Sequence, residues 1–164
     1  AHTTGADMGA TVLRPATHDD LSALMLIAEA MHMESPRFSR LQFSGEKVQR
    51  LFARMIGSPD ALLLVAERNG ELTGGVAGMV TPHWFSDDLV SNDYALFLLP
   101  EHRGGTTAVR LARAYIEWAQ AKGAKMIQLG ISTGVHAEET AALYKAIGLK
   151  KFSEGFEVQA CAQD

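Results

Sequence analysis

Two apolar runs on either side of Asn69-Gly70 constrain the fold of this chain more than any other feature. The segment ALLLVAERNGELTGGVAGMV, residues 61–80, is rich in aliphatic and β-branched residues both before and after that dipeptide. Asn and Gly tolerate the positive φ angles that a two-residue hairpin turn requires. The segment therefore predicts two antiparallel strands, and LVSNDYALFLL, residues 89–99, predicts a third long strand.

Two segments with helical periodicity precede this meander. A capping-box pair, Thr17 with Asp20, predicts the start of the first helix, and Pro36 predicts its end because proline cannot continue the hydrogen-bond ladder. The second helix is expected from about Ser44 to the GSPD turn that begins at Gly57. The apolar faces consist of Leu21, Leu24, Met25, Ala28 and Met31 in the first helix and Val48, Leu51, Phe52 and Met55 in the second.

The remaining elements alternate between strand and helix. A short strand is expected in ATVLRPAT, residues 10–17, before the first helix. After the meander we predict a helix over 106–122, a buried strand over 125–132, a helix over 136–147 and a last strand over 150–160. This order predicts an α+β fold with a mixed, mostly antiparallel central sheet flanked by helices, with crossovers toward the end of the chain.

Composition restricts the class of protein. The 164 residues favour a flexible segment over 1–10 and a single domain over 11–164. A net charge of -4 disfavours a broad nucleic-acid-binding surface, and no apolar run is long enough to predict a membrane span. Cys161 is the only cysteine, so no internal disulfide can form, and a reducing, cytoplasmic location is the natural expectation.

A glycine-containing corner, LFLLPEHRGGTTAVRLARAY, joins the third long strand to the next helix. A helix N-terminus has unpaired backbone N–H groups and a partial positive charge, so it attracts anions. Gly104 and Gly105 let the chain approach an anion closely, and Arg103 adds a guanidinium whose fork suits phosphate oxygens. From the residues alone, a phosphate site and a plain glycine-rich turn both remain open.

The strand ending in Pro100, the corner that follows it and LYKAIGLKK further on together resemble the GNAT superfamily of acyl-CoA-dependent acetyltransferases. In that family an Arg/Gln-x-x-Gly-x-Gly/Ala loop holds the CoA diphosphate through its amides. The resemblance assigns this role to Arg103, Gly104, Gly105, Thr106, Thr107 and Ala108. Thr106 stands where the family usually has its first motif glycine, and a requirement for positive φ there would weaken binding.

The resemblance also implies a mechanism of acetyl transfer from acetyl-CoA to an amine. The strand before the loop would offer backbone groups to the cofactor at Leu98 and Leu99, with Leu98 best placed to polarise the thioester carbonyl. Tyr144 occupies the position of the family's general acid. The family's asparagine upstream of that tyrosine is not evident. Its place is taken by His136, by Thr133 or by no residue, and the sequence leaves these alternatives open.

The general base stays open among several residues. Asp93 on the strand, Glu34 with Ser35 at the end of the first helix, and His83 in the TPHWFSDD loop are the candidates. Each also has an ordinary structural interpretation, and bulk water can take the proton instead.

Other functions are weighed against this hypothesis. A catalytically silent acyl-CoA-binding regulatory module would have the same scaffold. A nucleotide-binding α/β protein is disfavoured, because no Lys-Ser/Thr pair follows the glycines and no second glycine fingerprint is present. The six histidines show no paired metal-ligand spacing, so no metal is expected. The expected partner is an amine substrate, and the family resemblance also allows a homodimer.

Overall fold

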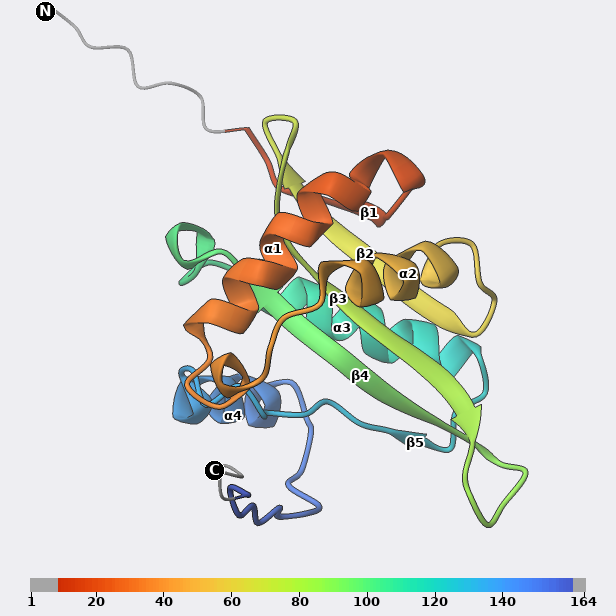
Figure 1. Ribbon diagram of the computed structural model, residues 1–164. Helices are drawn as coiled ribbons and strands as arrows, with labels where there is room; N and C mark the ends of the chain where they lie inside the picture. Colours follow the sequence, from red (N-terminus) through yellow and green to blue (C-terminus); the bar gives the residue numbers. More distant parts are fainter. Residues whose placement is uncertain (1–8, 161–164) are drawn as a thin grey trace, which may run out of the picture.

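The computed structural model describes residues 9–160, which form a five-stranded sheet with helices on both faces (Figure 1). The spatial order of the strands is β1-β2-β3-β4-β5, and every neighbouring pair is antiparallel except β4 and β5. The strands are β1 (Val12–Pro15), β2 (Ala61–Arg68), β3 (Glu71–Pro82), β4 (Leu89–Leu98) and β5 (Met126–Ile127). The predicted mixed, mostly antiparallel sheet is confirmed.

The described residues include four α-helices, and three of them pack on the sheet. Helices α1 and α2 pack against each other on one face, and α3 lies on the opposite face, behind the sheet in the view of Figure 1. Helix α4 lies beside the end of β4, below α1 in the same view. The helices are α1 (Leu21–Glu34), α2 (Gly45–Met55), α3 (Thr107–Ala121) and α4 (Ala137–Ala146).

The two faces of the sheet carry separate hydrophobic cores, as the alternation of side chains along a strand requires. On β2, Val65 packs in the cluster under α1 and α2, whereas its neighbour Ala66 packs in the cluster under α3. On β3, Ala77 and Val76 divide in the same way. The chain therefore holds its sheet between two layers, and a one-residue register slip would exchange their contents.

The hairpin predicted from Asn69-Gly70 joins β2 to β3. Asn69 has φ 53° and Gly70 has φ 80°, the positive pair of angles that a two-residue hairpin turn needs. The strands pair from Arg68 with Glu71 at the turn to Ala61 with Met79 at the far end. The prediction made from the dipeptide and its apolar flanks is confirmed.

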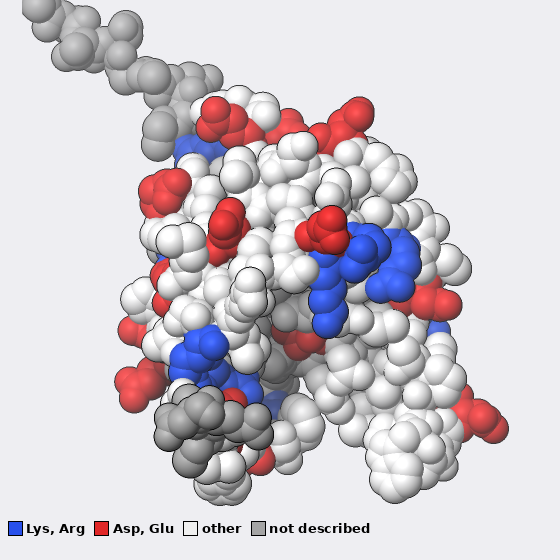
Figure 2. Space-filling view, in the orientation of Figure 1, with Lys and Arg blue, Asp and Glu red and all other residues white. Residues whose placement is uncertain are grey.

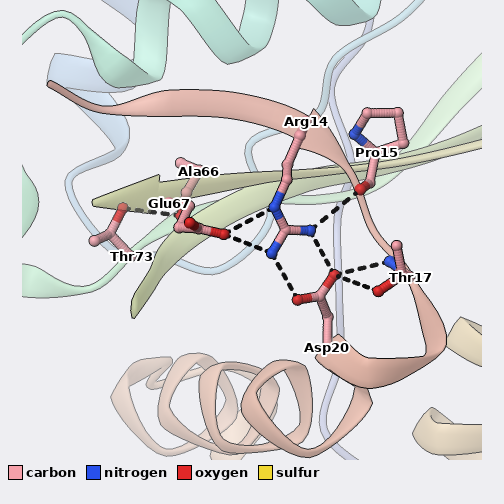
Figure 3. A network of polar contacts seen from close by, with 7 residues as sticks. All are labelled: Arg14, Pro15, Thr17, Asp20, Ala66, Glu67 and Thr73. Atoms are coloured by element: carbon pink, nitrogen blue, oxygen red, sulfur yellow. Dashed lines mark hydrogen bonds and ion pairs between the residues drawn. The ribbon is translucent and has the colours of Figure 1, made fainter. Parts of the chain in front are cut away.

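A polar network fixes the N-terminal end of α1 to the sheet (Figure 3). Arg14 on β1 donates from Nη1 and Nη2 to the two carboxylate oxygens of Asp20, at 2.7 and 2.8 Å, and from Nε to Glu67 on β2 at 2.8 Å. The Thr17 amide donates to the same Asp20 carboxylate at 2.8 Å. Thr17 and Asp20 thus interact as predicted, but a 3₁₀ turn, His18–Asp20, precedes the helix, which begins at Leu21.

The predicted strands at the C-terminal end of the chain are mostly absent. The strand expected over 125–132 is regular only at Met126–Ile127, and the last strand, expected over 150–160, is wrong because residues 151–160 contain neither helix nor strand. A strand forms only where its backbone groups can pair with a neighbouring strand. The chain leaves the sheet after β5, so residues 150–160 have no neighbouring strand there. Glu157 forms ion pairs with Arg37 and Arg40, which attach this exposed segment to the turn after α1. Cys161 lies outside the described residues.

Candidate functional site

A cleft opens where β4 and β5 separate. The two strands pair only at Val90 with Met126 and at Ser91 with Ile127, and the chain then diverges through residues 128–136. Their separation leaves a cavity of about 150 Å³, lined by β4, residues 130–136, the end of α1, the start of α3 and Tyr144 of α4. Figure 2 shows a hollow in the face that carries α1 and α2, with acidic atoms inside it and lysine and arginine atoms on two sides.

A β-bulge on β4 sets which backbone groups face the cleft. Ala77 pairs with Ala95 and Gly78 pairs with Asp93, so Tyr94 is the extra residue. Before the bulge, the Ser91 carbonyl accepts from the Gln128 amide on the β5 side. Along a regular strand, backbone groups point alternately toward one neighbouring strand and the other. The extra residue of the bulge reverses this alternation, so the residues of β4 whose backbone faces β5 are different before and after Tyr94.

Beyond the bulge, Leu98 directs its backbone away from β3. The Leu99 amide donates to the Thr73 carbonyl on β3 at 2.9 Å, so by alternation the neighbouring Leu98 faces the other way. The Leu98 carbonyl accordingly accepts from Arg103 Nε at 2.9 Å. Of the two residues predicted to offer backbone groups to a cofactor, Leu98 faces the cleft, and Leu99 uses its amide within the sheet.

The glycine corner forms an accessible helix N-terminus. A short 3₁₀ turn, Pro100–His102, leads into Gly104, which has φ +88°, and Thr106 is the N-cap of α3. Thr106 has φ -91°, so Gly104 supplies the left-handed turn and the threonine has an ordinary conformation. No side chain caps this helix and its first turn holds no acidic residue, so the amides at its start are left for an external anion.

Arg103 directs its guanidinium toward α1. Its Nη1 and Nη2 donate to the two carboxylate oxygens of Glu34, each at 2.6 Å, and the guanidinium lies 5.1 Å from the centre of the Phe97 ring. These charge-assisted bonds lower the pKa of Glu34 and raise that of Arg103. The two residues, predicted separately as an acceptor-side carboxylate and a phosphate ligand, lie in direct contact.

Tyr144 and Asp93 lie in the wall of the same cleft. Tyr144 is 6% exposed, and burial is the main cause that raises the pKa of its phenol, with the Asp93 carboxylate and Tyr115 adding to it. Asp93 accepts a hydrogen bond from the Gly130 amide at 2.8 Å, but burial still raises the pKa of its carboxyl. The phenol therefore stays protonated at neutral pH, and the carboxyl is a stronger base than an exposed aspartate.

The remaining candidates from the sequence have different positions. Ser35 is buried, and its hydroxyl donates to the Thr133 carbonyl at 2.5 Å and accepts from the Phe38 amide. His136 and Thr133 line the cleft, and His136 precedes α4 with φ 46°. His83 contacts Phe85 edge-to-face in the loop between β3 and β4 and is not a lining residue of this cleft.

Several residues of the site give no local signal in the sequence. The bulge at Tyr94 shows no glycine or proline. Ser91 and Tyr115 are buried polar residues, and their sequence surroundings are those of an ordinary strand and helix. Burial raises the pKa of Tyr115 to about 12. Residues 130–136, GISTGVH, do carry two glycines after a strand, which is the one signal that could have marked them as a site-lining loop.

Comparison with known families places the chain in a class of enzyme. The model described as "Acetyltransferase (GNAT) family" matches residues 27–149, which is most of the chain and includes the cleft. The chain therefore belongs to the GNAT family of acetyltransferases, and it is an N-acyltransferase. No curated protein matches the sequence significantly.

Solved structures share the fold at low sequence identity. An aminoglycoside N-acetyltransferase in complex with CoA has a TM-score of 0.75 at 12% identity, with 96% of this chain and 99% of that chain covered. A predicted acetyltransferase with acetyl-CoA from Clostridium acetobutylicum has 0.71 at 16%, with 92% and 96% covered. A putative acetyltransferase from Agrobacterium tumefaciens has 0.71 at 20%, with 91% and 99% covered. No helix among residues 9–160 of this chain is long and apolar enough to cross a membrane.

Proposed function

We propose that this enzyme transfers an acetyl group from acetyl-CoA to a primary amine, by direct attack of the amine on the thioester. The observation that carries the proposal is the cleft between β4 and the diverging chain. It holds Tyr144 and Asp93 and extends to the N-terminus of α3. We assign the roles of proton donor to Tyr144, proton acceptor to Asp93 and anion site to the start of α3, and this shared cleft supports the assignment.

The residues at the start of α3 suit the diphosphate of CoA. Gly104 and Gly105 place no side chain over the corner, and a Cβ at either position would meet nothing within 4 Å. Backbone amides from Gly104 to Ala108 would hold the diphosphate, with the Thr106 and Thr107 hydroxyls as further donors. Arg103 adds positive charge at the entrance to this loop. Bound acetyl-CoA supplies the thioester from which the acetyl group is taken.

Leu98 is the proposed electrophilic element. Its backbone faces the cleft, so its N–H would donate to the thioester carbonyl oxygen, on which negative charge builds during attack. A single donor of this kind contributes about 3 kcal/mol of transition-state stabilisation in acyl transfer. Leu99, whose amide bonds Thr73, supports this position from the β3 side.

Two protons move in the reaction, and the cleft has a group for each. The acceptor ammonium must lose a proton before attack, and Asp93, with its raised pKa, would accept it through a water molecule. The departing thiolate must gain a proton, and the neutral Tyr144 phenol would donate it. Glu34 is the second carboxylate of the cleft, but Arg103 lowers its pKa, so it is the weaker base.

Acetyl transfer is tested by measuring thiol release from acetyl-CoA against a panel of polyamines, aminoglycosides, amino acids and peptides, with mass detection of the product. The mass of the product shows that an acetyl group was added to the amine but not which nitrogen carries it. Fragmentation of the product then locates the acetyl group. We expect amine-dependent release and a rise in Tm with millimolar acetyl-CoA. Absence of both with every amine would refute the proposal, and a Tm shift without release would favour the silent binding module.

A further inference from the structure

The Glu34–Arg103 ion pair lies across the boundary between the two halves of the proposed site. Arg103 is the first residue of the corner that leads into α3, and Glu34 is the last residue of α1 and lines the opposite wall of the cleft. The two side chains are 25% and 28% exposed, so the pair is partly shielded from water. Partial burial and bidentate geometry make this a strong contact compared with a fully exposed ion pair.

The Glu34 carboxylate lies at an electrostatically unfavourable position, and the positive charge of Arg103 compensates for it. Glu34 ends α1, where the partial negative charge of the helix C-terminus disfavours another negative charge. His32 is the basic residue of that last turn, and its Nε2 lies 2.7 Å from the Leu41 carbonyl, away from Glu34. Arg103 is therefore the main cation that stabilises the Glu34 carboxylate at this position, and His136, in the same cleft, makes a smaller contribution.

The same guanidinium fixes the end of β4. Arg103 Nε donates to the carbonyl of Leu98, the residue whose amide is proposed to polarise the thioester. The next residues, Gly104 and Gly105, have open space around them. The Arg103 side chain is thus the contact that ties the start of this corner to both the strand and α1.

The end of α1 is also attached to the other side of the cleft. Ser35, next to Glu34, donates its hydroxyl to the Thr133 carbonyl in the diverging segment. Glu34 and Ser35, the last residue of α1 and its C-cap, therefore contact the two walls, one through Arg103 and the other through Thr133. A shift of α1 would be transmitted to both.

We propose that Glu34 and Arg103 are positioning residues, which hold the diphosphate-binding corner and the Leu98 peptide at a fixed place relative to the acceptor wall. This inference rests on the proposed function of the cleft. Arg103 acts on cofactor binding through Glu34, while the backbone amides of the corner contact the diphosphate. In the competing arrangement, Arg103 breaks its contact with Glu34 and binds the diphosphate directly.

The two arrangements predict opposite effects of Glu34→Gln on CoA affinity. If the pair positions the corner, the variant weakens CoA binding about tenfold in isothermal titration calorimetry, although Glu34 touches no phosphate. If Glu34 merely competes with the diphosphate for Arg103, the variant binds CoA more tightly. Unchanged or tighter binding overturns the proposal.

A double-mutant cycle and a matched control complete the experiment. Arg103→Met should weaken CoA binding at least as much as Glu34→Gln, and the double variant should be no weaker than Arg103→Met alone, because one shared contact is lost. Additive losses would overturn the proposal. The control is Asp20→Asn, which breaks the similar ion pair at the other end of α1 and should leave CoA affinity unchanged.

Hydrogen exchange separates this inference from the proposed function. Amides of residues 99–108 should exchange faster in Glu34→Gln and in Arg103→Met than in the wild type or in Asp20→Asn, without any cofactor present. If the wild type binds no CoA, the proposed function fails and the exchange rates alone decide the positioning role. Unchanged exchange in both variants overturns it.

Discussion

At each end of helix α1, an arginine forms a bidentate ion pair with a carboxylate. At the N-terminal end, Arg14 holds Asp20 and also bonds Glu67 on the sheet. At the C-terminal end, Arg103 holds Glu34 and bonds a backbone carbonyl of β4. The chemistry is alike, but only the second pair lines the cleft.

The difference between the two pairs lies in what each arginine joins. Arg14 connects regular elements, β1 and β2 with the start of α1, and the Asp20 side chain is only 10% exposed. Arg103 connects a strand end and an irregular corner with the end of α1, and Glu34 is 28% exposed. We expect the first pair to govern stability and the second to govern binding. Asp20→Asn tests the first half of that expectation, Glu34→Gln tests the second, and variants at Tyr144, Thr106 and Asp93 show what other residues of the proposed site contribute.

The largest effect is expected from Tyr144→Phe, inside the cleft. Removal of the phenol hydroxyl should lower kcat about 100-fold, because the leaving thiolate loses its proton donor. CoA affinity should stay the same, since the ring that packs in the α3 core is retained. Steady-state kinetics and calorimetry measure the two quantities. Unchanged turnover would remove Tyr144 from the mechanism.

Thr106→Asp should act on binding while sparing the fold. Aspartate is a good N-cap, and a negative charge suits the start of α3, so Tm should hold or rise. The same charge would repel the CoA diphosphate and weaken its binding about 30-fold. Calorimetry and thermal melts test both halves. A large fall in Tm would show that the threonine is structurally required, and full affinity would place the diphosphate elsewhere.

Asp20→Asn should act on stability while sparing turnover. Hydrogen bonds from Arg14 hold the pKa of Asp20 at about 2, below its ordinary 3.8, so the ionised form stabilises the folded state. Its contribution, about 2 kcal/mol, is complete above pH 4 and is lost as the pH falls toward 2. Chemical denaturation at pH 7 should detect this loss in the variant, and the difference from wild type should shrink in acid.

Equal stability of the two proteins at pH 7 would argue that the Arg14 network contributes nothing net. A fall in the kcat of Asp20→Asn, measured where the variant is fully folded, would show that the N-terminal ion pair of α1 also affects catalysis. Only the second result would require Arg14 and Arg103 to be treated as parts of one network.

The smallest change in stability is expected from Asp93→Asn, and it has the opposite sign. Burial raises the pKa of Asp93, so the protonated form suits the folded state and stability is lost as pH rises through that pKa. Asparagine can still accept from the Gly130 amide without a charge. The variant should therefore melt at a slightly higher temperature at pH 7, with the gain vanishing in acid, while turnover falls. A lower Tm at pH 7 would contradict this account.

Much of the fold could be predicted from short sequence patterns because the interactions behind them are local. Asn69-Gly70 selects its turn through its own backbone preferences, and Pro36 ends α1 through its missing amide. The corner at Gly104 was visible for the same reason. The last strand was mispredicted since strand formation over 150–160 depends on a paired edge that the local sequence cannot reveal.

The arrangement of the site could be predicted only in part. The sequence identified Tyr144, Asp93 and the residues from Arg103 to Ala108 as candidates. The fold brings Tyr144, Asp93, Arg103 and Ala108 around one cleft, and residues 104–107 lie in the corner between the last two. The sequence contained no indication that Arg103 pairs with Glu34, because the two are 69 positions apart and each has many potential partners.

The amino-acid sequence by itself determined the hairpin, the helices and the glycine corner, because each follows from preferences of residues that are neighbours along the chain. Tertiary structure decided where β4 leaves β5, which backbone groups the bulge at Tyr94 turns toward the gap, and which carboxylate each arginine holds. Those outcomes depend on contacts between distant segments, whose free energies appear only once two cores have packed on the sheet.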